Sequence, residues 1–310
     1  MNTRVLWTDV APRDGLQNIP DRVSTDAKVR LVRGLLAAGI ARVEATAFVS
    51  PRWVPQLADA GDVLRELDPD DMTRVRVLIP NRRGLELALE HGVRNVLLTI
   101  GATDTFNRRN VNQPVRESMT DLRRIAVHAK QAQCTVDVAL SVSFGCPFEG
   151  RVPLQRVVEL CAEMVEAGVA EIALADTIGV ATPAAVTEAC AAVTRAVPLQ
   201  QLSLHVHDTR GLGVANVLAA YEIGVRGFDG SVGGVGGCPF APRSTGNVCS
   251  EDALQALIAA GADVEVDLGR LCAVAQTLER DLGRELPGKL YRAGIWSGAP
   301  AAVPSEASVG

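Results

Sequence analysis

The sequence predicts an α/β protein whose main body is a closed (β/α)8 TIM barrel, followed by a C-terminal helical and irregular appendage. Eight short β-branched runs alternate with longer helical patterns, and two-residue hairpin signals are mostly absent between them, which favours parallel strands joined by helices. A doubly wound open sheet is the alternative fold. It is disfavoured because no GxGxxG sequence follows the first strand and because the strand count is high.

The eight predicted strands are short and mostly apolar, as expected for strands buried in a parallel sheet. In chain order they are Val5–Val10, Arg42–Thr46, Arg74–Ile79, Asn95–Ile100, Thr135–Phe144, Glu171–Ala175, Leu202–His207 and Gly227–Val232.

Amphipathic stretches between these strands predict the helices. Ser24 or Thr25 supplies a start signal for the first helix, and Thr182 followed by Pro183 supplies one for a later helix. Glycine directly after a helical pattern is typical of a left-handed helix end, and this holds for Gly39, Gly92, Gly168 and Gly224. The predicted helices are Asp26–Ala38, Val115–Gln131, Leu154–Ala167, Pro183–Ala196 and Val214–Ile223.

The chain is expected to divide into three parts. Residues 1–263 form the catalytic barrel. Residues 264–298 form an appendage that packs on the barrel or on a partner, with helical periodicity over Leu271–Leu282. Residues 299–310 are expected to be a disordered tail.

Composition argues against several classes of protein. The net charge is −5, with no basic run long enough to follow a phosphate backbone, so nucleic acid is not an expected partner. No stretch approaches the roughly 20 apolar residues of a membrane span. The N-terminus lacks the pattern of a signal peptide, and the seven scattered cysteines include no CxxC, so we expect a reducing, cytoplasmic location.

In a barrel of this kind, catalytic residues lie at the carboxyl ends of the strands. We therefore expect polar residues that carry chemistry at strand ends and apolar residues in strand middles.

The strongest candidate site is a pair of histidines on one strand. Over Leu202–His207 apolar residues alternate with Ser203, His205 and His207, so the two imidazoles share a face that points into the barrel mouth. Neutral imidazole nitrogens at this spacing can reach the same ion. The alternative is a pair of hydrogen-bonded core histidines.

Charged residues also follow two other strands. Arg13 and Asp14 come after the first strand, where a carboxylate can complete a ligand set and a guanidinium can stabilise an oxyanion. Glu44 lies among apolar residues of the second strand, and Arg13 is its expected partner. Asp176 and Thr177 end the sixth strand in the same way. The alternative for these residues is a set of structural ion pairs.

A glycine-rich loop follows the eighth strand, from Gly233 through Cys238 to Gly246. It lacks the Gly-Lys-Ser/Thr ending of a nucleotide-binding P-loop. A loop of this kind can act as a lid that brings the Cys238 thiol to a reacting carbon. The alternative is a spacer loop with an incidental cysteine.

Together these residues resemble the 3-hydroxy-3-methylglutaryl-CoA lyases, within the barrel metallolyases that open with an Arg-Asp-Gly motif. The resemblance extends over nearly the whole chain, to about Pro287. Its most specific blocks are Pro12–Asn18, Phe48–Gln56, Phe144–Gly150, Asp176–Gly179, His205–Thr209, Gly236–Pro239 and Thr245–Asn247.

The resemblance implies a metal site and the roles of the residues around it. The implied ligands of Mg²⁺ or Mn²⁺ are Asp14, His205, His207 and Asn247. Arg13 would stabilise the enolate oxygen of the departing thioester, and Cys238 would donate or shuttle a proton. The remaining implied residues are Glu44 and Asp176 as acid/base or supporting carboxylates, and Gln17 and Thr177 as supporting side chains.

The implied reaction is a retro-Claisen cleavage of an acyl-CoA, with acetyl-CoA and acetoacetate as products and a role in leucine degradation. His205 and Asp14 are both candidates for the base, and a homo-oligomer, a dimer or larger, is expected. The chain departs from the family at Ile19-Pro20 and Arg243, so citramalyl-CoA or a longer 3-hydroxy-3-alkylglutaryl-CoA are alternative substrates. Two further alternatives are a condensing relative that uses acetyl-CoA and a 2-oxo acid, and an inactive barrel scaffold.

Overall fold

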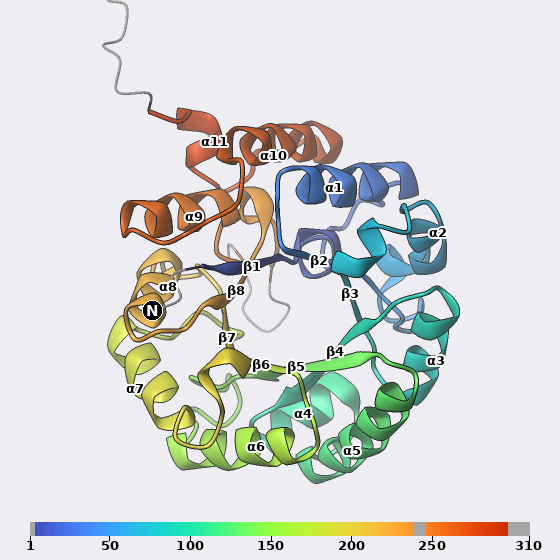
Figure 1. Cartoon of the computed structure of the whole chain (residues 1–310), viewed down its shortest axis with the longest axis vertical. Helices are drawn as coiled ribbons and strands as arrows, with labels where there is room; N and C mark the ends of the chain where they lie inside the picture. Colours follow the sequence, from blue (N-terminus) through green and yellow to red (C-terminus); the bar gives the residue numbers. More distant parts are fainter. Residues whose placement is uncertain (1–3, 238–245, 297–310) are drawn as a thin grey trace, which may run out of the picture.

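The computed structural model describes residues 4–237 and 246–296. Eight parallel strands close into a barrel in chain order, because β1 pairs with both β2 and β8. The predicted (β/α)8 fold is therefore confirmed (Figure 1). The strands are β1 (Leu6–Asp9), β2 (Arg42–Ala47), β3 (Val75–Leu78), β4 (Asn95–Gly101), β5 (Thr135–Ser141), β6 (Glu171–Asp176), β7 (Leu202–Val206) and β8 (Gly227–Gly230).

Helices surround the barrel on its outside (Figure 1). The helices are α1 (Thr25–Ala37), α2 (Ala60–Arg65), α3 (Arg82–Glu90), α4 (Asp104–Val111), α5 (Val115–Gln131), α6 (Leu154–Glu166), α7 (Pro183–Val193), α8 (Gly213–Glu222), α9 (Ser250–Ala259), α10 (Leu268–Leu282) and α11 (Leu290–Ala293). None of the helices in the described ranges is long and apolar enough to span a bilayer.

The predicted helix ends are explained by local chemistry. Ser24 caps α1 by accepting from the amide of Ala27, and Thr182 caps α7 by accepting from the amide of Ala185. Each bond satisfies an amide that the first helical turn leaves without an intrahelical partner. The four glycines predicted to end helices all have a positive φ, as a left-handed helix end requires: Gly39, Gly92, Gly168 and Gly224.

The middle of the barrel contradicts one sequence expectation. Arg76, Asp137 and Asp229 occupy strand interiors in β3, β5 and β8, yet all three are buried. The expectation of apolar strand middles is wrong at these positions. Opposite charges meet there, since Arg76 lies within 4 Å of both carboxylates, and this pairing offsets the cost of removing each charge from water.

The segment after the barrel strands packs on the beginning of the chain. Helix α10 lies beside α1 (Figure 1), and the amide of Asp267 donates to the carbonyl of Ala38. Closer to the mouth, Ser250 accepts from Trp7 Nε1 and donates to Asp9. These contacts fix the loop before α9, which carries Asn247, against the end of β1. The division of the chain at residue 263 stays a prediction.

Candidate metal centre

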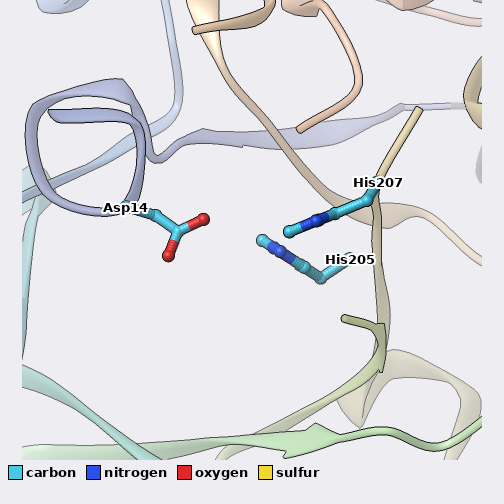
Figure 2. A group of neighbouring side chains, drawn as sticks. All are labelled: Asp14, His205 and His207. Carbon is cyan, nitrogen blue, oxygen red and sulfur yellow. The ribbon is translucent and has the colours of Figure 1, made fainter. Parts of the chain in front are cut away.

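Three of the predicted ligands converge at the carboxyl ends of the strands. Asp14, His205 and His207 each offer a ligand atom, and these atoms lie within 4.8 Å of one another. Figure 2 shows the Asp14 carboxylate facing both imidazoles. Asp14 lies on a helical turn directly after β1, whereas His205 lies on β7 and His207 follows its end. Because β8 pairs with β7 on one side and β1 on the other, the sheet itself brings these residues together.

Asn247 joins the same group. Its backbone forms an isolated bridge with His207, and its Nδ2 donates to Asp14 Oδ2 at 2.9 Å. Asn247 Oδ1 and His207 Nδ1 are buried and have no hydrogen-bond partner within residues 4–237 and 246–296. Buried polar atoms are rarely left in that state. A carboxylate, two imidazoles and an amide oxygen are donors that suit a divalent cation, so the four residues fit such an ion.

Asp14 is held by three neighbouring side chains. Arg13 Nη1 and Gln17 Nε2 each donate to Asp14 Oδ1 at 2.7 Å, and Asn247 donates to the other oxygen. Burial opposes ionisation of Asp14, but the positive charge of Arg13, followed by the interaction with His205, outweighs it, so the pKa of Asp14 is lowered. The residue is therefore anionic at neutral pH, which suits a candidate ligand of a cation.

The two histidines lie in different electrostatic surroundings. Burial lowers the pKa of His207 to about 4, with a further contribution from His205, so His207 is neutral at pH 7. Burial also disfavours the charged form of His205, but Asp229, whose Oδ2 lies 3.5 Å from His205 Nδ1, overcomes it and raises the pKa. Among the described residues, Asp229 thus lies behind the ring of His205.

The predicted ion pair between Arg13 and Glu44 is present. Arg13 Nε donates to Glu44 Oε1, and Arg76 Nε donates to Glu44 Oε2 at 3.0 Å. Glu44 is fully buried, so both of its oxygens face guanidinium groups. This geometry orients Arg13 beside Asp14. A direct catalytic role of Glu44 stays a prediction.

The predicted residues at the carboxyl end of β6 accept hydrogen bonds from backbone amides. Asp176 accepts from the amides of Val180 and Ala181 at 2.8 and 2.9 Å, and Thr177 Oγ1 accepts from the amide of Val142. Burial raises the pKa of Asp176. These bonds shape the loops after β5 and β6 at the barrel mouth. Cys238, the predicted thiol, lies outside the described residues.

Sequence reasoning missed two charged residues that support the site, Arg76 and Asp229. Each stands inside a predicted strand, where an isolated charge is costly unless it is paired. For Arg76 the sequence does indicate a buried charge that needs a partner, because Val75 and Val77 flank it. The identity of its partners depends on side-chain contacts inside the barrel, and the sequence pattern does not contain them.

The fold and this donor set define the class of the protein. It is a (β/α)8 barrel with a candidate divalent-metal centre at the carboxyl ends of its strands.

Comparison with known proteins gives the family. The chain belongs to the HMGL-like family, whose profile matches residues 4–278. It is 41% identical over 300 residues to the (R)-citramalyl-CoA lyase of Chloroflexus aurantiacus, covering 94% of this chain and 95% of that protein. It is 40% identical over 286 residues to a hydroxymethylglutaryl-CoA lyase of Bacillus subtilis, covering 92% and 96%.

Solved structures agree with this assignment. The structure of an HMG-CoA lyase from Acinetobacter baumannii, in complex with coenzyme A and 3-methylmalate, aligns with a TM-score of 0.91 at 36% identity, over 97% of this chain and 98% of that one. The Bacillus subtilis HMG-CoA lyase aligns with a TM-score of 0.89 at 38% identity, over 93% and 98%. The predicted family resemblance and the prediction of a lyase are confirmed.

Proposed function

We propose that this chain is a divalent-metal-dependent carbon–carbon lyase that cleaves a 3-hydroxy-3-methylglutaryl-CoA-like thioester. The products would be acetyl-CoA and a 3-oxo acid, which is acetoacetate for the methyl substrate. The observation that carries the proposal is the convergence of Asp14, His205, His207 and Asn247 beside the buried Arg13. The family membership supports the same type of reaction.

These four residues would hold Mg²⁺ or Mn²⁺, which when bound would orient the substrate oxygens and acidify the tertiary hydroxyl. Asp14, or His205 when its Nε2 is not bound to the ion, would accept the hydroxyl proton. The carbon–carbon bond then breaks, and its electron pair passes to the α-carbon of the thioester to give an enolate. Arg13 would stabilise the enolate oxygen, because Asp14 and Glu44 hold its guanidinium in a fixed position.

The enolate must then gain a proton at carbon to become acetyl-CoA. We propose Cys238 as the group that delivers it from the glycine-rich loop. The variant Cys238→Ser should keep the divalent metal content of the parent chain and lose most of the turnover. Full turnover in this variant would rule out the thiol.

A second candidate substrate is (R)-citramalyl-CoA. The observation that favours it is the 41% identity to a lyase named for that substrate, which equals or exceeds the identity to the hydroxymethylglutaryl-CoA lyases reported above. The departure at Ile19 does not decide between the two, because Ile19 is buried in the hydrophobic core and its carbonyl accepts from Gln56. Arg243 lies outside the described residues.

An activity screen separates the candidates. Purified protein with Mg²⁺ would receive hydroxymethylglutaryl-CoA, citramalyl-CoA or a longer 3-hydroxy-3-alkylglutaryl-CoA, and mass spectrometry would identify the acid released with acetyl-CoA. Acetoacetate supports the first proposal, and pyruvate supports the second. Consumption of acetyl-CoA with a 2-oxo acid would instead identify a condensing enzyme. A protein that takes up no divalent ion would be the scaffold alternative.

Other properties stay predictions. They are the cytoplasmic location, assembly into a homo-oligomer and a role in leucine degradation. Light scattering on the purified protein would test the assembly, and a monomer would contradict it.

A further inference from the structure

Below the candidate metal centre, one buried guanidinium contacts two carboxylates that face in different directions. Arg76 has no solvent exposure. Its Nη2 lies 2.8 Å from Glu44 Oε2 and 3.1 Å from Asp229 Oδ2. A planar guanidinium can hold two carboxylates at fixed angles, which the compact ammonium group of lysine cannot reproduce.

The contact with Asp229 leads to one candidate ligand. Asp229 and His205 are partners in the β7–β8 register, and Asp229 Oδ2 lies 3.5 Å from His205 Nδ1. A carboxylate at Nδ1 favours the tautomer that carries its proton there, which leaves Nε2 free to bind a cation. We call the series Arg76, Asp229 and His205 the first contact chain.

The contact with Glu44 leads to a second ligand. Glu44 accepts from Arg13 as well as from Arg76, and Arg13 Nη1 donates to Asp14 Oδ1 at 2.7 Å. We call the series Arg76, Glu44, Arg13 and Asp14 the second contact chain. The two chains start at the same guanidinium and end at ligand residues that face each other across the centre (Figure 2).

We infer that Arg76 is a positioning residue that fixes His205 and Asp14 relative to each other, through Asp229 on one side and Glu44 on the other. The inference rests on the proposed metal site but not on the identity of the acyl substrate. Residues that orient metal ligands from behind typically change metal affinity about 10- to 100-fold when they are replaced.

The remaining neighbours of Arg76 provide a matched control. Asp137 Oδ2 lies 3.7 Å from Arg76 Nη1 and 3.0 Å from Arg42 Nη1. Like Asp229, it is a buried strand aspartate that faces Arg76. The other charged partner of Asp137 is Arg42, which pairs with Glu171 and lies at the first position of β2, away from the candidate ligands. Asp137→Asn and Asp229→Asn therefore remove the same charge from the same network, but only the second change affects a residue behind a ligand.

The test measures Mn²⁺ affinity of the purified full chain by electron paramagnetic resonance titration, without substrate. Asp229→Asn and Arg76→Lys should weaken Mn²⁺ binding by about 10- to 100-fold, whereas Asp137→Asn should leave it unchanged. Thermal unfolding of all three variants would be recorded alongside. If Arg76→Lys does not fold, the comparison of Asp229→Asn with Asp137→Asn still tests the inference.

Two outcomes would overturn the inference about Arg76 and leave the proposed function unaffected. One is Mn²⁺ binding at parental affinity in folded Asp229→Asn. The other is an equal loss of affinity in Asp137→Asn, which would indicate general loosening of the barrel. If the parent chain binds no Mn²⁺, the proposed function itself fails, and that result is visible before any variant is compared.

Discussion

Two groups of buried and half-buried polar residues lie in the barrel, and they differ in how their charges are satisfied. The interior group consists of Arg42, Arg76, Asp137, Glu171 and Asp229, in which every side chain has an opposite charge within 4 Å. The rim group consists of Asp14, His205, His207 and Asn247. In each group two buried atoms lack a hydrogen-bond partner among the described residues. Arg76 Nη1 and Asp229 Oδ1 belong to side chains of opposite charge that pair at 3.1 Å, whereas His207 Nδ1 and Asn247 Oδ1 belong to neutral side chains.

The difference shows that buried charge by itself does not mark an active site. The interior charges neutralise one another across strands and stabilise one arrangement of the barrel. The rim group instead directs nitrogen and oxygen atoms toward a common point, which is the arrangement that a cation requires. Mutations in the two groups should therefore have different effects.

The largest effect is expected for a ligand of the rim group. His207→Ala should lose Mn²⁺ affinity by more than the roughly 10- to 100-fold typical of supporting residues, and lyase turnover should fall with it. Mn²⁺ titration and product assay would measure both. The control is His128→Ala, on α5 outside the site, which should match the parent. Unchanged metal binding in His207→Ala would remove it from the ligand set.

A smaller effect is expected for Arg13, which contacts the rim group without being a ligand. Arg13→Lys keeps the charge but loses the geometry that Asp14 and Glu44 hold. We expect kcat at saturating Mn²⁺ to fall roughly 10²- to 10³-fold, as for loss of one donor to a developing oxyanion. Mn²⁺ affinity should fall by at most the roughly 10- to 100-fold expected of a member of the second contact chain. Steady-state kinetics and Mn²⁺ titration would separate the two quantities. Weaker metal binding with kcat unchanged at saturating Mn²⁺ would mean that Arg13 mainly supports Asp14.

A third prediction concerns a buried carboxylate that belongs to neither group. Asp9 accepts from Ser250 Oγ and from the amide of Ala11, and burial raises its pKa from 3.8 to about 7. Between about pH 4 and pH 7 the folded chain keeps this proton and the unfolded chain releases it, so this residue makes stability fall as pH rises through that window. By contrast, Arg76 overcomes the effect of burial on Asp229, whose pKa is lowered.

Asp9→Asn removes the ionisable group and preserves its shape. The free energy of unfolding of this variant should equal that of the parent near pH 4 and exceed it by a few kcal/mol near pH 8. Urea unfolding at a series of pH values would measure the difference. A constant difference across the range would show that Asp9 does not titrate in this window.

The smallest effect is expected for an exposed ion pair that is at least as short as the interior ones. Arg123 Nη2 lies 2.7 Å from Glu163 Oε2, but both side chains are more than 40% exposed. Glu163→Gln should change the free energy of unfolding by less than about 1 kcal/mol, whereas Asp229→Asn breaks the buried pair with Arg76, a change of the kind that costs about 3–5 kcal/mol. Chemical denaturation would compare them. Equal losses would contradict the contrast between buried and exposed charges.

Much of the fold could be predicted because it depends on local signals. Helix α5 begins and ends at the predicted residues, Val115 and Gln131, since its apolar spacing is regular and Pro114 precedes it. Strand ends differ by a few residues, as with β5, which ends at Ser141 and not Phe144. There a backbone with positive φ at Val142 interrupts the strand.

The candidate site was predictable in part. The histidine spacing indicated His205 and His207, and the family resemblance supplied Asp14 and Asn247. The contacts of Arg76 with Asp229 were not predictable, because the two residues are 153 positions apart and meet only inside the closed barrel. The role of Cys238 stays a prediction, since it lies outside the described residues.

Pairing of β1 with β8 also has a consequence for protein synthesis. Asn247 donates to Asp14, which precedes it by 233 positions, and the ring closes only after β8 has left the ribosome. Early β/α units of a growing chain can gain structure, since domains of this size fold through partly formed states. The metal centre cannot assemble in such a chain. A product that stops before Asn247 therefore lacks one of the candidate ligands, and its early strands alone cannot supply activity.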